Sequence, residues 1–260
     1  MHAMLNVAVK AARAAGNVIT RHIDRVDNLT IRSKSANDFV SEVDHQAEDA
    51  IIRILKRAYP QHAILAEESG SQGDSEYTWI IDPLDGTTNF LYGIPQFATS
   101  IALAHRGRIE HAVIFDPLKN ELFTASRGGG AQLNNRRMRV SQRKDLKGAL
   151  LGTGIPFRET QNLDHYLETL RVLLPSTAGV RRAGSAALDL AYVAAGRFDG
   201  FWEYGLHSWD MAAGVLLVQE AGGMVAEPDG GENYLQSGNV VAAGPKVFKA
   251  MLEALKPLSR

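Results

Sequence analysis

The pattern of apolar runs changes near residue 145, and this change limits the folds available to the chain. Before it, runs of strand character at 97–105, 108–115 and 121–126 are joined by tight turns, which is typical of an antiparallel meander. After it, strand-like runs alternate with amphipathic segments of helical period. The sequence therefore predicts an α/β fold of layered sheets and helices, with sub-domains at 1–145 and 146–260.

The other expected elements show either a helical apolar stripe or a run of β-forming residues. Helices are predicted at Leu5–Ile23, Asp44–Tyr59, Leu163–Leu174, Ser185–Ala195, Met211–Ala221 and Pro245–Leu255. Further strands are predicted at Ala63–Leu65, Thr78–Asp82, Ala149–Thr153, Gly200–Tyr204, Gly223–Ala226 and Asn239–Ala243. Pro60 ends the second helix because its ring does not fit a helix interior.

Composition narrows the possible chemistry. The 260 residues carry a formal net charge of −1, which argues against a nucleic-acid binder driven by bulk positive charge. The chain contains no cysteine, so disulfides and thiolate metal sites are excluded and any metal must be held by oxygen or imidazole. The longest uncharged stretch, Phe90–Ala104, is too short and too polar to span a membrane. A cytoplasmic protein is the expectation.

Two aspartates lie three positions apart in the segment Trp79–Phe90, directly after an apolar strand. Asp82 and Asp85 would repel each other on so short a turn unless a hard cation lay between them. The backbone N–H groups of Gly86 and Thr87 would suit an anion beside that cation. Adjacent cation and anion sites are what metal-assisted phosphate chemistry needs. The alternative is that Asp-Pro-Leu-Asp-Gly forms an ordinary turn.

The surroundings of this segment favour the functional interpretation. Glu67, Glu68 and Ser69 follow another predicted strand, so Glu67 can supply a third carboxylate from a neighbouring strand end. Asp210 precedes a predicted helix and has a rival explanation as an N-cap.

Together these segments resemble the inositol monophosphatase family over essentially the whole chain. The resemblance is carried by Glu67–Ser69, Trp79–Phe90 and Trp209-Asp210 with Ala212–Gly214. For a bacterial branch of the family it is carried by the opening Met1–Asn6 and by Gly184–Gly196. It implies an inositol monophosphatase-like αβαβα sandwich of helices with mixed or antiparallel sheets. It also implies Mg²⁺-dependent hydrolysis of a phosphate monoester, myo-inositol 1-phosphate before other polyol phosphates, with sensitivity to lithium.

The resemblance also assigns metal ligands. Glu67, Asp82 and the backbone carbonyl of Leu84 would bind the first Mg²⁺. Asp82, Asp85 and Asp210 would bind the second, and a third, weaker Mg²⁺ would use Glu67. Ligands that are all oxygen agree with Mg²⁺ rather than Zn²⁺.

Further roles follow from the same resemblance. Thr87 and Glu67 would orient the nucleophilic water, with Asp44 supporting them. The implied substrate contacts are Glu67, Leu84, Asp85, Gly86, Thr87, Arg181, Gly184, Ser185, Ala186, Glu203 and Asp210.

Several of these residues have structural alternatives. Ser185, where family members often have Thr, is also a typical helix N-cap. Glu203 at a strand end is more often merely solvated, and Arg181 with Arg182 more often forms a surface pair.

Rival activities and roles also remain open. Fructose bisphosphatases and phosphoadenosine phosphate phosphatases belong to the same superfamily, but only 15 positions separate Glu67 from Asp82, which leaves little room for their larger insertions. The bacterial branch further resembles partners of the transcription antitermination machinery and RNA polymerase, and a homodimer is implied. The one basic run comprises Arg136, Arg137, Arg139, Arg143, Lys144 and Lys147, a pattern that is usually a solvated face.

Overall fold

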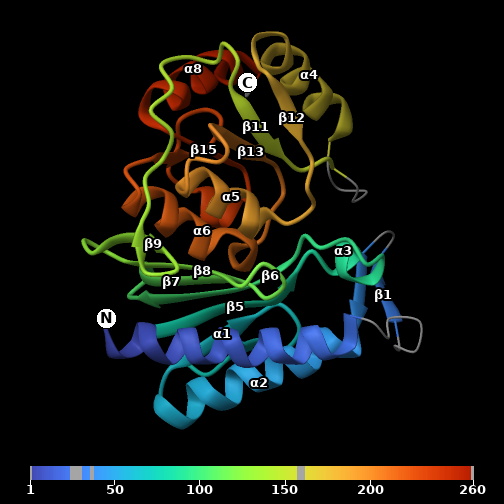
Figure 1. Ribbon diagram of the computed structural model, residues 1–260, viewed down its shortest axis with the longest axis vertical. Helices are drawn as coiled ribbons and strands as arrows, with labels where there is room; N and C mark the ends of the chain where they lie inside the picture. Colours follow the sequence, from blue (N-terminus) through green and yellow to red (C-terminus); the bar gives the residue numbers. More distant parts are fainter. Residues whose placement is uncertain (1, 24–30, 36–37, 157–161, 259–260) are drawn as a thin grey trace.

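Helices and sheets alternate in five layers. The structure is a computed structural model that describes residues 2–23, 31–35, 38–156 and 162–258. Figure 1 shows α1 and α2 at one end, a first sheet, α5 and α6, a second sheet, and α4 with α8 at the other end. The predicted αβαβα arrangement and α/β class are confirmed. These helices are α1 (Ala3–His22), α2 (Glu42–Ala58), α4 (Leu163–Leu173), α5 (Ala186–Ala194), α6 (Ser208–Glu220) and α8 (Pro245–Leu255).

The first sheet has eight strands in the order β10-β9-β8-β7-β6-β5-β3-β4. Its strands are β3 (Ala63–Ala66), β4 (Gly70–Gln72), β5 (Tyr77–Asp85), β6 (Ala98–His105), β7 (Arg108–Asp116), β8 (Glu121–Ser126), β9 (Gly130–Leu133) and β10 (Arg136–Arg137). All neighbours are antiparallel except β3 and β5. Because those two strands run parallel, their carboxyl ends meet at one edge. The N–H of Glu67, directly after β3, donates to the carbonyl of Ile81 on β5 at 3.1 Å.

The second sheet has five strands in the order β12-β11-β13-β15-β14. They are β11 (Leu150–Thr153), β12 (Gly179–Arg181), β13 (Gly200–Glu203), β14 (Met224–Ala226) and β15 (Val240–Ala243). β11 pairs in parallel with both β12 and β13, and the remaining pairs are antiparallel. The sheet is therefore mixed.

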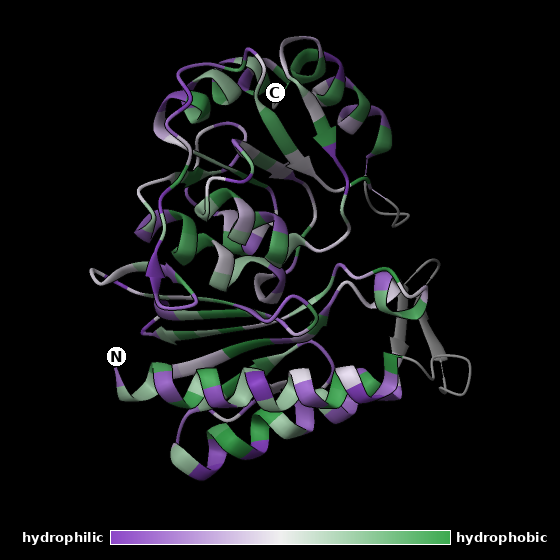
Figure 2. Cartoon of the chain, in the orientation of Figure 1, coloured by the Kyte–Doolittle hydropathy of each residue, from purple (hydrophilic) through white to green (hydrophobic). Residues whose placement is uncertain are grey.

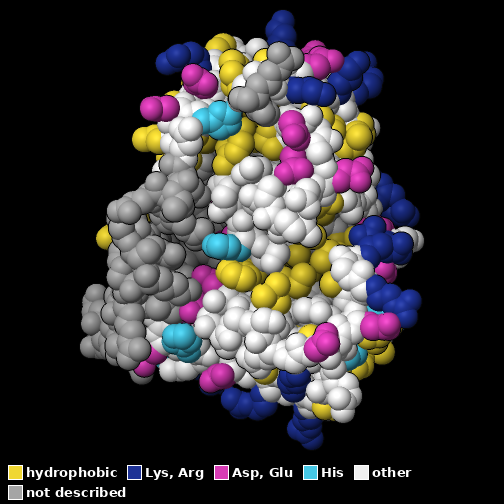
Figure 3. Space-filling model, turned by 180° about the vertical axis from the view of Figure 1, so that it is seen from behind, with side chains coloured by type: hydrophobic (Ala, Val, Ile, Leu, Met, Phe, Trp, Pro, Cys, Tyr) yellow, Lys and Arg dark blue, Asp and Glu magenta, His cyan; other side chains and the backbone are white. Residues whose placement is uncertain are grey.

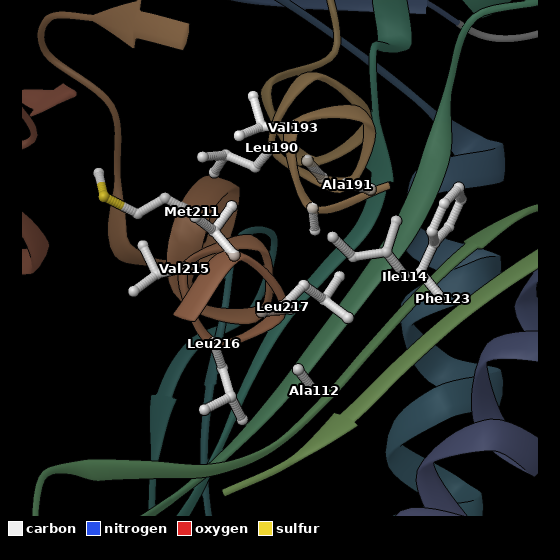
Figure 4. Close-up of a cluster of buried hydrophobic side chains, with 14 of the residues drawn as sticks. Ala112, Ile114, Phe123, Leu190, Ala191, Val193, Met211, Val215, Leu216 and Leu217 are labelled. Carbon is white, nitrogen blue, oxygen red and sulfur yellow. The ribbon is translucent and has the colours of Figure 1, made fainter. Parts of the chain in front are cut away.

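Strand alternation sends apolar side chains to both faces of the first sheet. In β7, Ala112 and Ile114 belong to the core beneath α5 and α6, whereas Val113 belongs to the core beneath α1 and α2. Figure 4 shows Leu217 of α6 beside Ile114 of β7, whereas Leu190 of α5 lies toward α6; all three belong to the first core. A third core lies between the second sheet and α4 with α8. Burial on both faces explains why these strands are apolar almost throughout.

The outer helices α1 and α2 are amphipathic, as their spacing predicted. Figure 2 shows hydrophobic and hydrophilic positions striped along both. In α1, Ala8, Ala12, Ala15 and Ile19 are buried at helical intervals. This face packs in one core with α2 and the first sheet, and α1 contacts α2, β6 and β7.

The structure adds elements that the sequence did not predict. They are β1 (Ile31–Ser35), β2 (Asp38–Ser41), β4, β9, β10, β12 and α7 (Tyr234–Ser237), whereas α3 (Thr87–Leu91) is the short helix that the turn at Gly86 allows. Each has two to five residues, too few for a periodic signal. No helix among the described residues has the length and apolar character needed to cross a membrane.

The division near residue 145 falls between β10 and β11, where the chain leaves the first sheet for the second. Helices α5 and α6, from the second part of the chain, pack on strands of the first sheet. The two sub-domains at 1–145 and 146–260 stay a prediction.

Candidate active site

Residues from both sheets and from the first turns of α5 and α6 line a polar cavity of about 450 Å³. Eleven of the predicted site residues lie there: Glu67, Asp82, Leu84, Asp85, Gly86, Thr87, Gly184, Ser185, Ala186, Glu203 and Asp210. The other lining residues are Thr88, Asn89, Tyr92, Thr153, Gly154, Arg182, Asp189, Gly205 and Leu206. The fold thus joins segments that are far apart in the sequence.

The Asp-Pro-Leu-Asp segment is a turn, and it also shapes the cavity wall. Pairing between β5 and β6 breaks register between Asp82 and Asp85, so both carboxylates reach the cavity. The N–H of Leu84 donates to Asp82 Oδ1 at 2.9 Å. Gly86 then caps α3 with φ of 96°, a left-handed conformation that favours glycine. The turn interpretation and the functional one are therefore compatible.

Asp85 and Asp210 are oriented by helix starts. Ser185 is the N-cap of α5 and donates from its hydroxyl to Asp85 Oδ2 at 2.6 Å. The N–H of Ala187 donates to the same oxygen at 2.7 Å. The N-cap of α6 is His207 and not Asp210, which lies in the first turn and accepts the N–H of His207 at 2.6 Å. Asp210 also lines the cavity. Each capping contact uses one carboxylate oxygen.

The buried carboxylates repel one another. Burial raises the pKa of Asp82 well above its usual range, and the charges of Glu67 and Asp85 raise it further. Burial and the charge of Asp85 likewise raise the pKa of Asp210. Burial raises the pKa of Asp85 to about 6, against a hydrogen bond from Ser185 that lowers it. A cation in the cavity would offset this repulsion.

Among the residues that the structure describes, no three His, Asp or Glu side chains are grouped closely enough to hold a metal ion by themselves. The chemical type of the available ligands nevertheless suits a hard cation. The cavity offers carboxylate oxygens and the Leu84 segment, without thiolate or imidazole. Mg²⁺ keeps several waters and takes few protein ligands, so an open site of this type suits it.

Thr87 connects the cavity to α2. Its hydroxyl lies 2.9 Å from Asp44 Oδ1 and 3.1 Å from the carbonyl oxygen of Leu84. Asp44 is fully buried and does not line the cavity. Burial raises its pKa, while hydrogen bonds from Ser41 and Thr87 lower it. Asp44 therefore contacts the cavity wall through Thr87, and the charge of Glu67, also on that wall, adds to the rise in its pKa.

The structure places Arg181 and Arg182 differently. Arg181 ends β12, is exposed, and donates to the carbonyl of Val180 at 3.3 Å. It is absent from the cavity wall, where Arg182 lies instead. A Cβ on Gly184 would come within 3.0 Å of Arg182 Nη1, so this glycine leaves room for the guanidinium. Of the two, Arg182 is thus the one placed to meet a ligand.

Sequence reasoning also missed Asp189. This carboxyl is 1% exposed, lines the cavity, and its Oδ1 has no hydrogen-bond partner among the described residues. Burial and the charge of Glu203 raise its pKa. The signal was a single acidic residue within the apolar run Ala186–Ala194. A charge at the centre of a buried helix generally has a partner or a function.

Comparison with known proteins decides the family. The inositol monophosphatase family model matches residues 1–258. The chain belongs to this family. Nus factor SuhB of Pseudomonas aeruginosa is 57% identical over 99% of this chain and 97% of that protein. The extragenic suppressor protein suhB from Bartonella henselae is 47% identical, with a TM-score of 0.95 over 98% of this chain and 99% of that one. An inositol monophosphatase from Anabaena is 39% identical, with a TM-score of 0.88 over 97% and 95%.

Proposed function

We propose that the protein hydrolyses the phosphate monoester of a polyol in a Mg²⁺-dependent reaction, with myo-inositol 1-phosphate as the preferred substrate. The observation that carries the proposal is the set of buried carboxylates around one cavity, each with its pKa raised by burial and by the others. A fold does not by itself establish an activity, and it is this cavity together with family membership that supports hydrolysis.

One Mg²⁺ would be held by Glu67, Asp82 and the Leu84 carbonyl. A second would be held by Asp82, Asp85 and Asp210. A third, weaker Mg²⁺ would use Glu67. Bound Mg²⁺ supplies Lewis acidity toward the phosphate and a lowered pKa for water. The capping contacts on Asp85 and Asp210 leave their second oxygens for this role.

Thr87 would orient the attacking water together with Glu67. A hydroxyl has one proton to donate, and Asp44 Oδ1 at 2.9 Å is placed to accept it. The Thr87 oxygen then keeps lone pairs to accept a hydrogen bond from water. Asp44 contributes by fixing this direction from outside the cavity.

Substrate would be held by the groups of the cavity wall that come from the second part of the chain. Gly184, Ser185 and Ala186 bring the start of α5 to the cavity, where its dipole favours an anion. Glu203 at the end of β13 would accept hydrogen bonds from ring hydroxyls. Gly154 makes room for it, since a Cβ there would overlap the Glu203 carboxylate. Arg182 replaces Arg181 as the candidate cation for the phosphate.

A phosphate-release panel tests the proposal. Inositol, glycerol, fructose and adenosine phosphates are compared with and without Mg²⁺. We expect release that needs Mg²⁺ and is fastest with myo-inositol 1-phosphate. Release without metal, or from adenosine phosphates alone, would contradict it. Lithium at high millimolar concentration should inhibit uncompetitively.

A second candidate function is a role in transcription antitermination, in addition to catalysis. The relatives at more than half identity bear the name Nus factor SuhB. A transcription partner such as an antitermination factor or RNA polymerase would need a surface outside the cavity, because protein interfaces bury about 800 Å² per partner. Such a role would also place the chain in the cytoplasm.

The basic run is one candidate surface. All six of its Lys and Arg residues are exposed. In Figure 3 dark-blue side chains recur along the right-hand edge, with Asp and Glu in magenta between them. Only Arg143 has an ion pair among the described residues, with Asp199 at 3.1 Å. Rim charges of this kind steer association.

A pull-down from cell extract separates the two functions. Asp210→Asn should lose phosphate release yet retain a transcription partner. Charge reversal of Arg136, Arg137 and Arg139 should weaken the partner and spare release. If folded Asp210→Asn loses both phosphate release and the transcription partner, the two functions share a site. Sedimentation checks the homodimer that the family resemblance implies.

A further inference from the structure

Helix α2 carries two buried carboxylates one turn apart. Asp44 is 0% exposed and Glu48 is 4% exposed. Residues four positions apart lie on the same face of a helix. Asp44 reaches Thr87, whose hydroxyl lies 2.9 Å away, but the proposed mechanism leaves Glu48 without a role.

Glu48 holds the backbone just after Glu67. Its Oε2 accepts the N–H of Glu68 and its Oε1 accepts the N–H of Ser69, both at 2.9 Å. On the other side, the N–H of Glu67 donates to the carbonyl of Ile81 at 3.1 Å. The backbone around Glu67 is thus held both by the sheet and by α2.

The same arrangement recurs far from the cavity. Glu220 accepts the N–H of Gly128, in the turn after β8, and the N–H of Gly130, the first residue of β9, both at 2.8 Å. None of these three residues lines the cavity. Glu220 is therefore a matched example of a carboxylate that holds a turn without contact to the site.

We propose that Glu48 is a positioning residue for the active site. Acting together, Glu48 and Asp44 fix the separation between Glu67 and Thr87, because both are mounted on one rigid helix. The inference rests on the proposed function. Groups that orient metal ligands from behind typically change metal affinity or activity by about tenfold or more when they are altered.

The test compares Glu48→Gln with Glu220→Gln. Glutamine keeps the size of glutamate but replaces one acceptor oxygen with a donor. Each variant therefore loses one of the two hydrogen bonds that its carboxylate accepts from backbone N–H groups. Three quantities are measured: phosphate release against Mg²⁺ concentration, the rise in Tm on adding Mg²⁺ without substrate, and amide exchange at Glu68 and Ser69. Glu48→Asp, which keeps the charge and shortens the reach, replaces Glu48→Gln if that variant does not fold.

We expect Glu48→Gln to raise the half-saturating Mg²⁺ concentration and to lower kcat, each by about tenfold. Its Mg²⁺-induced rise in Tm should shrink, and exchange at Glu68 and Ser69 should accelerate. Glu220→Gln should change neither Mg²⁺ response by more than about twofold, although both variants lose Tm. Equal Mg²⁺ responses in the two variants would overturn the positioning role while leaving the proposed function intact. A wild-type protein that neither releases phosphate nor gains Tm with Mg²⁺ would overturn both.

Discussion

Asp85 is a buried carboxylate and also a proposed metal ligand. Its pKa is raised to about 6 by burial, so its charged form is disfavoured in the folded chain. A raised folded-state pKa contributes stability that is full below the unfolded pKa and is lost as pH rises through the folded value. Without metal, Asp85 should therefore destabilise the fold between about pH 4 and pH 6 and remain unfavourable above.

The direction of this pH dependence can be measured by comparing the Tm of wild type with that of Asp85→Asn in EDTA. The Tm difference in favour of the variant should grow as pH rises from 4.5 to 7, because asparagine carries no charge. Saturating Mg²⁺ should abolish or reverse that difference. A Tm difference that is independent of pH would contradict the raised pKa.

Glu203 tests the polyol side of the cavity. Glu203→Gln removes a charged acceptor but keeps the shape, and hydrogen bonds to charged groups contribute roughly 1.5–3 kcal/mol. We expect kcat/KM for myo-inositol 1-phosphate to fall about tenfold, because each 1.4 kcal/mol is a factor of ten. Glycerol phosphate should be much less affected. Equal losses on both substrates would show that Glu203 does not contact the polyol.

Among single residues, the sequence predicted the acidic residues of the cavity better than the residues that surround or position them. Asp82 and Asp85 stand out because two carboxylates on a short turn need an explanation. Arg182 was missed because nothing in the sequence tells which of two adjacent arginines faces a cavity. Glu48 was missed because its partners are backbone N–H groups about 20 positions away, which leave no side-chain pattern.

Among the elements, the start of α3 is the most sensitive. Gly86 has φ of 96°, and a Cβ there would lie 2.9 Å from the carbonyl oxygen of Gln96. Gly70 has φ of 70°, and a Cβ there would meet no atom within 4 Å, so this glycine is a matched control. A strained φ costs of order 1–3 kcal/mol.

Gly86→Ala should therefore lower the free energy of unfolding more than Gly70→Ala does, as measured by urea denaturation. The extra loss comes from the close carbonyl and should be about 1 kcal/mol or more. Gly86→Ala should also lower phosphate release, because α3 carries Thr87. If Gly86→Ala and Gly70→Ala lose the same free energy of unfolding, the close carbonyl of Gln96 does not add to the loss at Gly86.

The long elements were predicted because burial imposes a period on them. α1, α2 and α6 lie within a few residues of the expected bounds, and β6, β7 and β8 match closely. The expected start of α2 at Asp44 was two residues late, because Ser41 and Asp44 form a capping box around Glu42. Short edge strands such as β10 and β12 are fixed by pairing with a neighbour, and pairing leaves no trace in a local pattern.

For the whole molecule, the order of the layers followed from the resemblance rather than from periodicity. Apolar runs indicate that layers exist, but not that α5 and α6 lie between the two sheets. That placement creates the cavity, since it brings the starts of both helices to the carboxyl ends of β3 and β5. A site assembled from distant segments should stabilise the whole fold when it is filled.

Mg²⁺ should therefore raise the Tm of the wild-type protein. Ligand linkage gives about 2.7 kcal/mol when free metal stands at about 100 times its dissociation constant. Differential scanning calorimetry with increasing Mg²⁺ measures the effect, and the protein in Mg²⁺-free buffer with EDTA is the reference. An unchanged Tm would count against a site that is formed in the folded chain.

Phosphate release from myo-inositol 1-phosphate by wild type and Asp85→Asn, at saturating Mg²⁺ and with both proteins shown to be folded, tests the central claim most directly. The carboxylate cluster accounts for catalysis only if wild type is active and Asp85→Asn loses its turnover by orders of magnitude. Full activity in folded Asp85→Asn would contradict the assignment of this cavity as the metal-dependent active site.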